Sequence, residues 1–187
     1  RGQNLEKIGQ HAGDTSELFF NDMRVPADAL LGGVEGQGFV QMMRELPRER
    51  LIIGVQAVYG AKGALDATVK YVQERQAFGQ AIGQFQNTRF TLAQCASDIA
   101  AAEAFLNASV AAYERGELSP EAASALKLHT TEVMGRVADA CLQLFGGYGY
   151  MAEYPISRFW TDARVLRIYG GTSEIMKELV ARSLLGR

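Results

Sequence analysis

The sequence is poor in the residues that build disulfide frameworks and metal sites. Its 187 residues include two cysteines, Cys95 and Cys141, and two histidines, His11 and His129. Two cysteines are too few for a disulfide framework, and both lie in apolar helical patterns, so we expect reduced thiols in a core. His129 and Glu132 lie one helical turn apart, but a di-iron bundle needs Glu-x-x-His twice with further glutamates. A metal site is therefore not predicted.

Long apolar runs and clustered positive charge are also missing. No apolar run approaches the roughly 20 residues that span a bilayer, so we expect no transmembrane segment. The formal net charge is -2, and the lysines and arginines are scattered along the chain. This pattern argues against a nucleic-acid partner. No Gly-x-Ser-x-Gly elbow or Cys/His pairing occurs, so nucleophilic catalysis has no support.

The sequence is rich in apolar residues at helical spacing. Apolar residues recur at spacings of three and four, which predicts buried stripes on helices near residues 51–72, 85–113 and 120–145. A further helical region from about residue 156 is interrupted at Gly170 and Gly171. Long helices with short connections indicate a mainly α protein, an up-and-down four-helix bundle.

Local signals mark where these helices begin and end. Ser119 followed by Pro120 predicts a capped helix start, and Thr172 or Ser173 should cap the last helix, which runs to about residue 185. Pro47 predicts a kink or restart after a short amphipathic stretch at 39–45.

The first residues differ from the rest of the chain. Residues 17–26 alternate and carry aromatic and β-branched side chains, which predicts one or two strands. Isolated strands of this length are unstable and need partner strands. We therefore interpret residues 1–33 as the tail and linker of a β domain, and residues 34–187 as the helical bundle domain.

Two local features could carry chemistry. The Gly170–Glu174 turn opens a helix, where free backbone N–H groups can hold an anion or a carbonyl, although such turns most often only cap a helix. Glu49 lies between Arg48 and Arg50, an arrangement more often found on a solvated helix face. Neither feature identifies a function by itself.

Seven segments together resemble the acyl-CoA dehydrogenase family, in order and in spacing, along essentially the whole chain. They are Asp22-Met23-Arg24-Val25-Pro26, Leu46-Pro47-Arg48-Glu49-Arg50-Leu51, Glu74-Arg75-Gln76-Ala77-Phe78-Gly79, Gln143 to Tyr150, Glu153-Tyr154-Pro155, Arg158 with Asp162-Ala163-Arg164, and Ile168 to Ile175. The resemblance is strongest to the long-chain branch. It implies an oxidoreductase in which a glutamate removes the α proton of an acyl thioester while the β hydrogen leaves as hydride to FAD.

The resemblance also implies where the base lies. Most members carry the glutamate immediately before the glycine that corresponds to Gly171, but this sequence has Gly170 there. The long-chain and isovaleryl branches carry it on the earlier helix, at the position of Glu49. We therefore expect Glu49 to be the base, with its pKa raised by an apolar site.

The remaining roles follow position by position from the same resemblance. The implied substrate-binding residues are Arg50, Tyr169 and Gly171. The implied FAD-binding residues are Arg75, Phe78, Gln86, Gln143 and Gly147, which reach the FAD of a neighbouring subunit, and Thr172 and Glu174. Ala77 departs from the pattern, because many members have a hydroxyl residue there that bonds the cofactor.

Family members are about twice as long as this chain, so we expect a C-terminal fragment that is inactive alone. The implied partners are an acyl-CoA substrate, an electron-transfer flavoprotein as acceptor, and further copies in a homo-oligomer (a dimer or tetramer). The implied location is the bacterial cytoplasm or the mitochondrial matrix. Two alternatives stay open: a helical oligomerisation module without chemistry, and a related acyl-CoA oxidase or nitroalkane oxidase.

Overall fold

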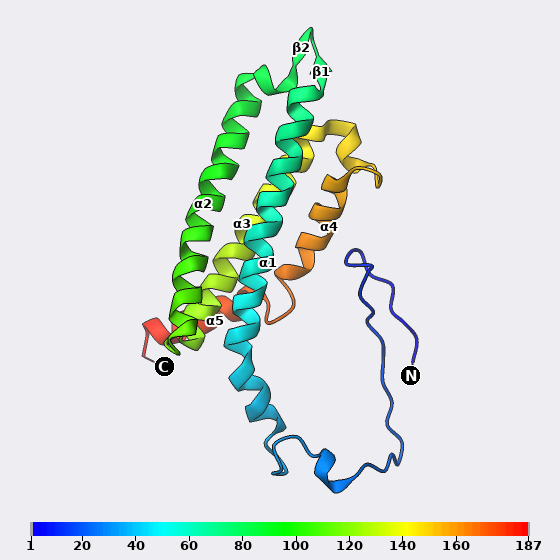
Figure 1. The fold of residues 1–187 in the computed structure, drawn as a ribbon, viewed down its shortest axis with the longest axis vertical. Helices are drawn as coiled ribbons and strands as arrows, with labels where there is room; N and C mark the ends of the chain where they lie inside the picture. Colours follow the sequence, from blue (N-terminus) through cyan, green and yellow to red (C-terminus); the bar gives the residue numbers. More distant parts are fainter. Residues whose placement is uncertain (1, 187) are drawn as a thin grey trace.

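The computed structural model describes residues 2–186, and within them the protein is mainly α-helical (Figure 1). The α-helices are α1 (Gly38–Glu74), α2 (Gln86–Glu114), α3 (Pro120–Phe145), α4 (Pro155–Leu166) and α5 (Ser173–Leu184). A small antiparallel hairpin joins α1 to α2, formed by β1 (Gln76–Ala77) and β2 (Gln80–Ala81). Short 3-10 turns cover Ala27–Ala29, Ile82–Gln84 and Gly146–Tyr150.

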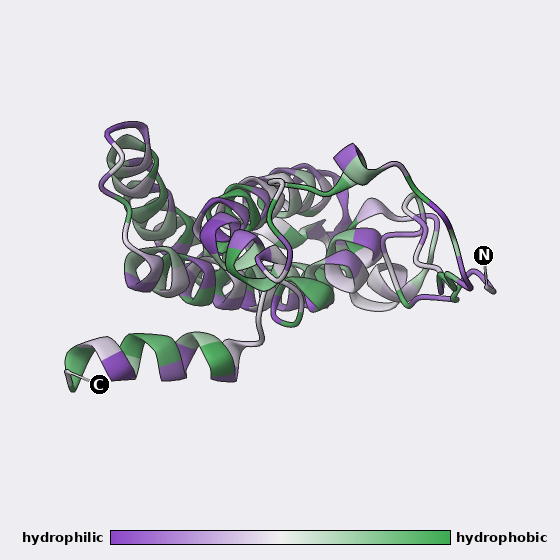
Figure 2. Ribbon diagram, turned by 90° about the horizontal axis from the view of Figure 1, so that it is seen from below, coloured by the Kyte–Doolittle hydropathy of each residue, from purple (hydrophilic) through white to green (hydrophobic). Residues whose placement is uncertain are grey.

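Helices α1 to α4 run alternately up and down, and α3 contacts each of the other helices (Figure 1). Helix α5 leaves this bundle and packs on α3 near the end where α1 begins (Figures 1 and 2). The predicted fold class, a mainly α up-and-down bundle, is confirmed.

The predicted caps are formed. The Ser119 hydroxyl accepts a hydrogen bond from the Ala122 N–H at 3.1 Å, with Pro120 at the first helical position. The Thr172 hydroxyl accepts from the Ile175 N–H at 3.4 Å and begins α5. Helix α3 ends at Gly146, whose φ of 59° is a conformation that favours glycine. These side chains set the boundaries of the helices that carry the site.

The predicted restart at Pro47 is wrong. Helix α1 is continuous from Gly38 to Glu74, with Pro47 inside it. A proline in a helix loses one backbone hydrogen bond. Continuation is explained by the buried stripe of α1 beyond Pro47, because packing of that stripe outweighs a single missing bond.

The predicted strands at residues 17–26 are also not formed. Those residues have no ladder partner in the described chain, and the only pairing of the N-terminal segment is an isolated bridge between Asn4 and Ser16. Their apolar side chains are exposed: Leu18, Phe19, Phe20, Met23 and Val25. Residues 2–186 contain no partner strand for this segment, so the alternating pattern alone does not form a strand.

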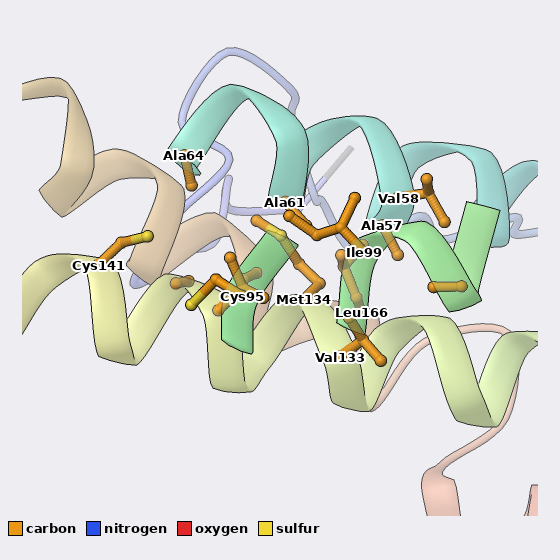
Figure 3. Close-up of a cluster of buried hydrophobic side chains, with 14 of the residues drawn as sticks. Ala57, Val58, Ala61, Ala64, Cys95, Ile99, Val133, Met134, Cys141 and Leu166 are labelled. Atoms are coloured by element: carbon orange, nitrogen blue, oxygen red, sulfur yellow. The ribbon is translucent and has the colours of Figure 1, made fainter. Parts of the chain in front are cut away.

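The core lies between α1, α2, α3 and α4 (Figure 3). It is built from small side chains on α1, such as Ala57, Ala61 and Ala64, which allow α3 to approach closely. Cys95 of α2 and Cys141 of α3 are buried free thiols in this core, as predicted. Within the described residues, no helix is long and apolar enough to cross a membrane, and no group of histidine, cysteine and acidic side chains could hold a metal ion.

Candidate functional site

The Gly170–Gly171 turn between α4 and α5 is packed directly against α1. Gly170 has a φ of 64°, and a Cβ atom built there would lie 2.5 Å from Cδ1 of Ile53 on α1. Gly171 has a φ of 102°, and its Cβ atom would lie 2.6 Å from Cε of Met176. The positive φ favours glycine at both positions, and a Cβ atom at either would also force the end of a neighbouring side chain to move.

Glu49 lies on α1 next to Arg50, one helical turn before the residue that contacts Gly170. Residues four apart on a helix are neighbours on one face, so Glu49 lies one turn from Ile53, the residue that fills the space beside Gly170. Its side chain is exposed and forms no ion pair or hydrogen bond with residues 2–186. The chain therefore places this carboxylate beside the turn without providing the apolar enclosure that was expected for a base.

Two buried cations hold the carbonyl groups of the turn. Arg50 is 5% exposed, and its guanidinium donates to the Gly170 carbonyl at 3.3 Å and to the Ser124 hydroxyl at 3.1 Å. Lys127 of α3 is 0% exposed and donates to the Gly171 carbonyl at 2.5 Å. Burial lowers the pKa of both groups, with Glu49 partly offsetting the effect on Arg50.

Tyr169 connects the turn to the same stripe of α1. Its hydroxyl donates to Oε1 of Gln56 at 2.7 Å, and Gln56 lies one turn beyond Ile53. Burial raises the pKa of Tyr169, and the bond to Gln56 partly offsets this rise. Tyr169, Gly170 and Gly171 thus lie together against α1.

Thr172 and Glu174 lie at the first turn of α5. Hydrogen bonds from its own backbone N–H and from the Thr172 hydroxyl lower the pKa of the Glu174 carboxyl. Ser173 is buried and donates to Glu132 of α3 at 2.7 Å, and Arg167 pairs with the same carboxylate at 3.4 Å. Helix α5 is therefore anchored on α3 by Glu132, a residue that the sequence pattern had suggested only as an unlikely metal ligand.

A second group of predicted residues lies at the other end of the bundle, around the hairpin (Figure 1). Arg75, Gln143 and Gly147 line one cavity of about 540 Å³ together with Tyr71 and Tyr148, among others. The Arg75 guanidinium lies 5.1 Å from the centre of the Tyr148 ring. The cavity combines a cation, an aromatic wall and open glycine backbone.

Phe78 and Gln86 lie at the same end of the bundle but do not line this cavity. Phe78 is at the hairpin tip, 95% exposed, with a positive φ of 51° that is unusual for an aromatic residue. Its ring forms an edge contact with that of Phe85, at 6.2 Å between centroids. Gln86 is exposed at the first position of α2. An aromatic side chain held outward in this way is suited to contact another molecule.

The two groups are far apart within one chain. The stretch of α1 from Arg50 to Glu74 is about 36 Å long at a rise of about 1.5 Å per residue. The structure therefore brings together Glu49, Arg50, Tyr169, Gly171, Thr172 and Glu174 at one end. It separates them from Arg75, Phe78, Gln86, Gln143 and Gly147 at the other.

A second cavity, of about 550 Å³, opens beside the N-terminal half of α1. Arg44 and Arg48 line it, with apolar walls that include Met43 and Leu118 and an aromatic wall from Tyr113. Arg48 is adjacent to Glu49 in the sequence. Glu45 lines the same pocket and lies 3.9 Å from Arg48, so one of the two guanidinium groups already faces a carboxylate.

Lys127, Gln56 and Ile53 were not predicted as site residues. Ile53 and Gln56 could have been found, since they follow Glu49 at four and seven residues on the same helix face. Lys127 gives no such signal, because a lysine inside a helical pattern ordinarily reaches solvent.

Comparison with known proteins matches most of the chain. A family model described as acyl-CoA dehydrogenase, C-terminal domain, matches residues 36–185. The mitochondrial long-chain specific acyl-CoA dehydrogenase of Sus scrofa is 46% identical over 99% of this chain and 43% of its own length.

Solved structures of acyl-CoA dehydrogenases superpose closely on this chain. The acyl-CoA dehydrogenase of Geobacillus kaustophilus superposes with a TM-score of 0.94 at 43% identity, over 98% of this chain and 48% of that one. A glutaryl-CoA dehydrogenase from Mycobacterium smegmatis in complex with FADH2 superposes with a TM-score of 0.93 at 26% identity, over 100% of this chain and 48% of that one. The chain thus spans about half the length of the relatives that it matches.

Proposed function

The chain belongs to the acyl-CoA dehydrogenase family, and we propose that it acts as the C-terminal half of an FAD-dependent enzyme that introduces a double bond between the α and β carbons of an acyl-CoA. The other half of the family length would supply the remaining walls of the site. The 46% identity to a long-chain specific relative supports a fatty acyl substrate.

One observation carries the assignment of the base to Glu49. Ile53 fills the space beside Gly170, so position 170 has no room for a carboxylate side chain. Glu49 lies one turn from Ile53 on the same face of α1. The turn therefore carries no carboxylate at position 170, and Glu49 is the carboxylate that α1 carries one helical turn from the contact with Gly170.

The role of Glu49 is to take the α proton of the thioester. This proton is weakly acidic, so the thioester oxygen needs hydrogen-bond donors as enolate charge develops. Within residues 2–186 no group accepts a hydrogen bond from the N–H of Gly170, Gly171 or Thr172. These donors at the start of α5 are available for the thioester oxygen or the cofactor.

The residues around the hairpin cavity fit the phosphate-bearing part of FAD. Gly146 and Gly147 have no atoms within 4 Å of where a Cβ would be, so their backbone is open to a ligand. Arg75 supplies positive charge and Tyr148 a flat aromatic wall. When bound, FAD would accept the hydride from the β carbon, and an electron-transfer flavoprotein would reoxidise it.

The separation of the two residue groups supports assembly from more than one copy. Thr172 and Glu174 lie at one end of the bundle, and Arg75 and Phe78 lie at the other. We infer that an FAD held at the α5 end of one copy is contacted by the hairpin end of a second copy. A homo-oligomer, dimeric or tetrameric, is the assembly that this arrangement requires.

Residues 1–33 fit the proposed tail of a β domain. Large apolar side chains are exposed along it and along the start of α1: Leu18, Phe19, Phe20, Met23, Val25, Leu31, Phe39 and Met42. Exposed apolar groups gathered in this way indicate a surface that another domain covers. The named relatives are mitochondrial or bacterial, which supports the mitochondrial matrix or the bacterial cytoplasm as the location.

The test is the absorbance of the flavin in the full-length protein. Anaerobic addition of a long-chain acyl-CoA should bleach the oxidised flavin band, and the product should be the 2-enoyl-CoA. A full-length protein that purifies without flavin, or whose flavin spectrum does not respond to acyl-CoAs of any length, would contradict the proposal.

A further inference from the structure

The most unusual side chain in the molecule is the Lys127 amine, which is completely enclosed. Lysines are almost never fully buried without a partner, because removing the ammonium from water is costly. Lys127 forms no ion pair within 4.0 Å among the described residues: Arg50 repels its charge, and the carboxylates of Glu132 and Glu174 only partly offset the cost of burial. Its recorded acceptor is the Gly171 carbonyl. The free-energy cost of burying the amine is accepted for a hydrogen bond to the Gly171 carbonyl, which indicates that the position of this carbonyl matters.

The hydrogen bond from Lys127 fixes the orientation of the whole peptide group between Gly171 and Thr172. In a trans peptide the C=O of one residue and the N–H of the next point in opposite directions. By holding the Gly171 oxygen towards α3, Lys127 directs the Thr172 N–H away from it. Arg50 has the same effect on the Gly171 N–H, because it holds the Gly170 oxygen at 3.3 Å.

The turn needs such a constraint. Two consecutive glycines populate both signs of φ at little cost, so the peptide between Gly171 and Thr172 could otherwise rotate. Gly171 already has a φ of 102°. The Lys127 bond selects the orientation in which the Thr172 N–H lacks an internal acceptor and is free for a ligand.

We propose that Lys127 is a positioning residue for the catalytic site, which aims the N–H at the start of α5 by holding the Gly171–Thr172 peptide. This inference rests on the proposed function for its catalytic consequence. The peptide orientation itself does not depend on that function, so the two can be tested separately.

The first measurement uses the 187-residue chain. Lys127→Met removes the donor and keeps a side chain of similar length. In ¹⁵N spectra the amide resonances of Gly171 and Thr172 should move or broaden, while those of the hairpin end stay in place. Thr68→Val is the matched control: Thr68 is also fully buried, but its hydroxyl donates to the Ala64 carbonyl within α1. It should leave the turn resonances unchanged.

The second measurement uses the full-length protein with FAD. Lys127→Met should lower kcat about 10-fold or more and change KM less than about 3-fold, because the donor is needed most in the transition state. Both constants are expressed per bound flavin, because Thr172 is also one of the implied FAD-binding residues, and a variant that loses flavin but keeps the wild-type kcat per bound flavin would overturn the proposal. Lys127→Arg keeps a donor and should recover most of the lost kcat, which also decides the matter if the methionine variant does not fold.

The possible results distinguish a failure of the Lys127 proposal from a failure of the proposed function. Unchanged Gly171 and Thr172 resonances in a folded Lys127→Met chain would overturn the proposal, as would a wild-type kcat in the same full-length variant. An arginine variant as slow as the methionine variant would also overturn it. Shifted turn resonances in a protein whose wild type does not oxidise acyl-CoA would instead refute the proposed function and leave the peptide constraint supported.

Discussion

Ile53 occupies the space that a side chain at position 170 would need: a Cβ atom on Gly170 would lie 2.5 Å from its Cδ1 atom. This contact joins the α4–α5 turn to α1. It also distinguishes the site from that of family members that carry a glutamate at the position of Gly170. It also predicts how the two residues respond to substitution.

Gly170→Ala should destabilise the chain by about 2–4 kcal/mol. About 1–2 kcal/mol comes from the positive φ and about 1–2 kcal/mol from the clash. Gly116→Ala is the control, since Gly116 has a φ of 71° and no atoms near its Cβ position. Ile53→Val removes the clashing Cδ1 and should recover part of the loss in the double variant. Urea unfolding of the wild type, the two single glycine variants and the Ile53→Val/Gly170→Ala double variant measures these free energies. Equal losses of unfolding free energy for Gly116→Ala and Gly170→Ala would contradict the prediction.

The stability contributed by Lys127 should depend on pH. Burial lowers its pKa, with Arg50 acting in the same direction and Glu132 and Glu174 in the opposite one. Between the lowered folded value and about 10.4, the unfolded chain holds a proton that the folded chain has lost. Unfolding then takes up protons, so folding stability rises with pH in that window.

The comparison that isolates this effect is wild type against Lys127→Met. The difference in unfolding free energy should shift in favour of the wild type as pH rises from neutrality towards about 10. A difference that is constant or falls over this range would show that the lysine titrates normally in the folded state.

The two cysteines should be inert in the native state. Cys95 is 5% exposed and Cys141 is 0% exposed, and burial and the neighbouring thiol raise the pKa of Cys141. A thiol-specific reagent at pH 8 should label neither residue in the folded chain and both after denaturation. Rapid labelling of the native chain would mean that α2 and α3 separate readily.

Leu126 should be among the most sensitive core positions. It is fully buried on α3, and its side chain packs against Gly54 of α1, where a Cβ would lie 3.1 Å from Cδ2. Leu126→Ala should cost about 2–5 kcal/mol of unfolding free energy. Leu184→Ala on α5, at an 81% exposed position, should cost less than about 0.5 kcal/mol. Similar losses at both positions would contradict the described core.

Much of the fold could be predicted because its signals are local. Ser119, Pro120 and Thr172 mark helix starts by their own side chains, and the apolar stripes of α1, α2 and α3 need only their own sequence. Residues 17–26 could not be placed, because a strand exists only with a partner. The continuation through Pro47 was also missed, because packing elsewhere along α1 decides it.

The site was predictable only in part for the same reason. Glu49 is proposed as the base because of Gly170, a departure from the family pattern that is visible in the sequence. Lys127 was not, because its acceptor is a backbone carbonyl 44 residues later in the chain. A backbone acceptor has no side chain that would mark it in the sequence.

The most direct test of the account is the rate of acyl-CoA oxidation by full-length protein with Glu49→Gln, followed by flavin reduction in stopped flow. The matched control is Glu45→Gln, one turn earlier on α1, where the glutamate is also exposed and lies 3.9 Å from Arg48. We predict that Glu49→Gln slows flavin reduction by about 10²–10⁴-fold with flavin still bound, while Glu45→Gln stays within about 3-fold of wild type. Flavin reduction at the wild-type rate in Glu49→Gln would show that the base lies elsewhere.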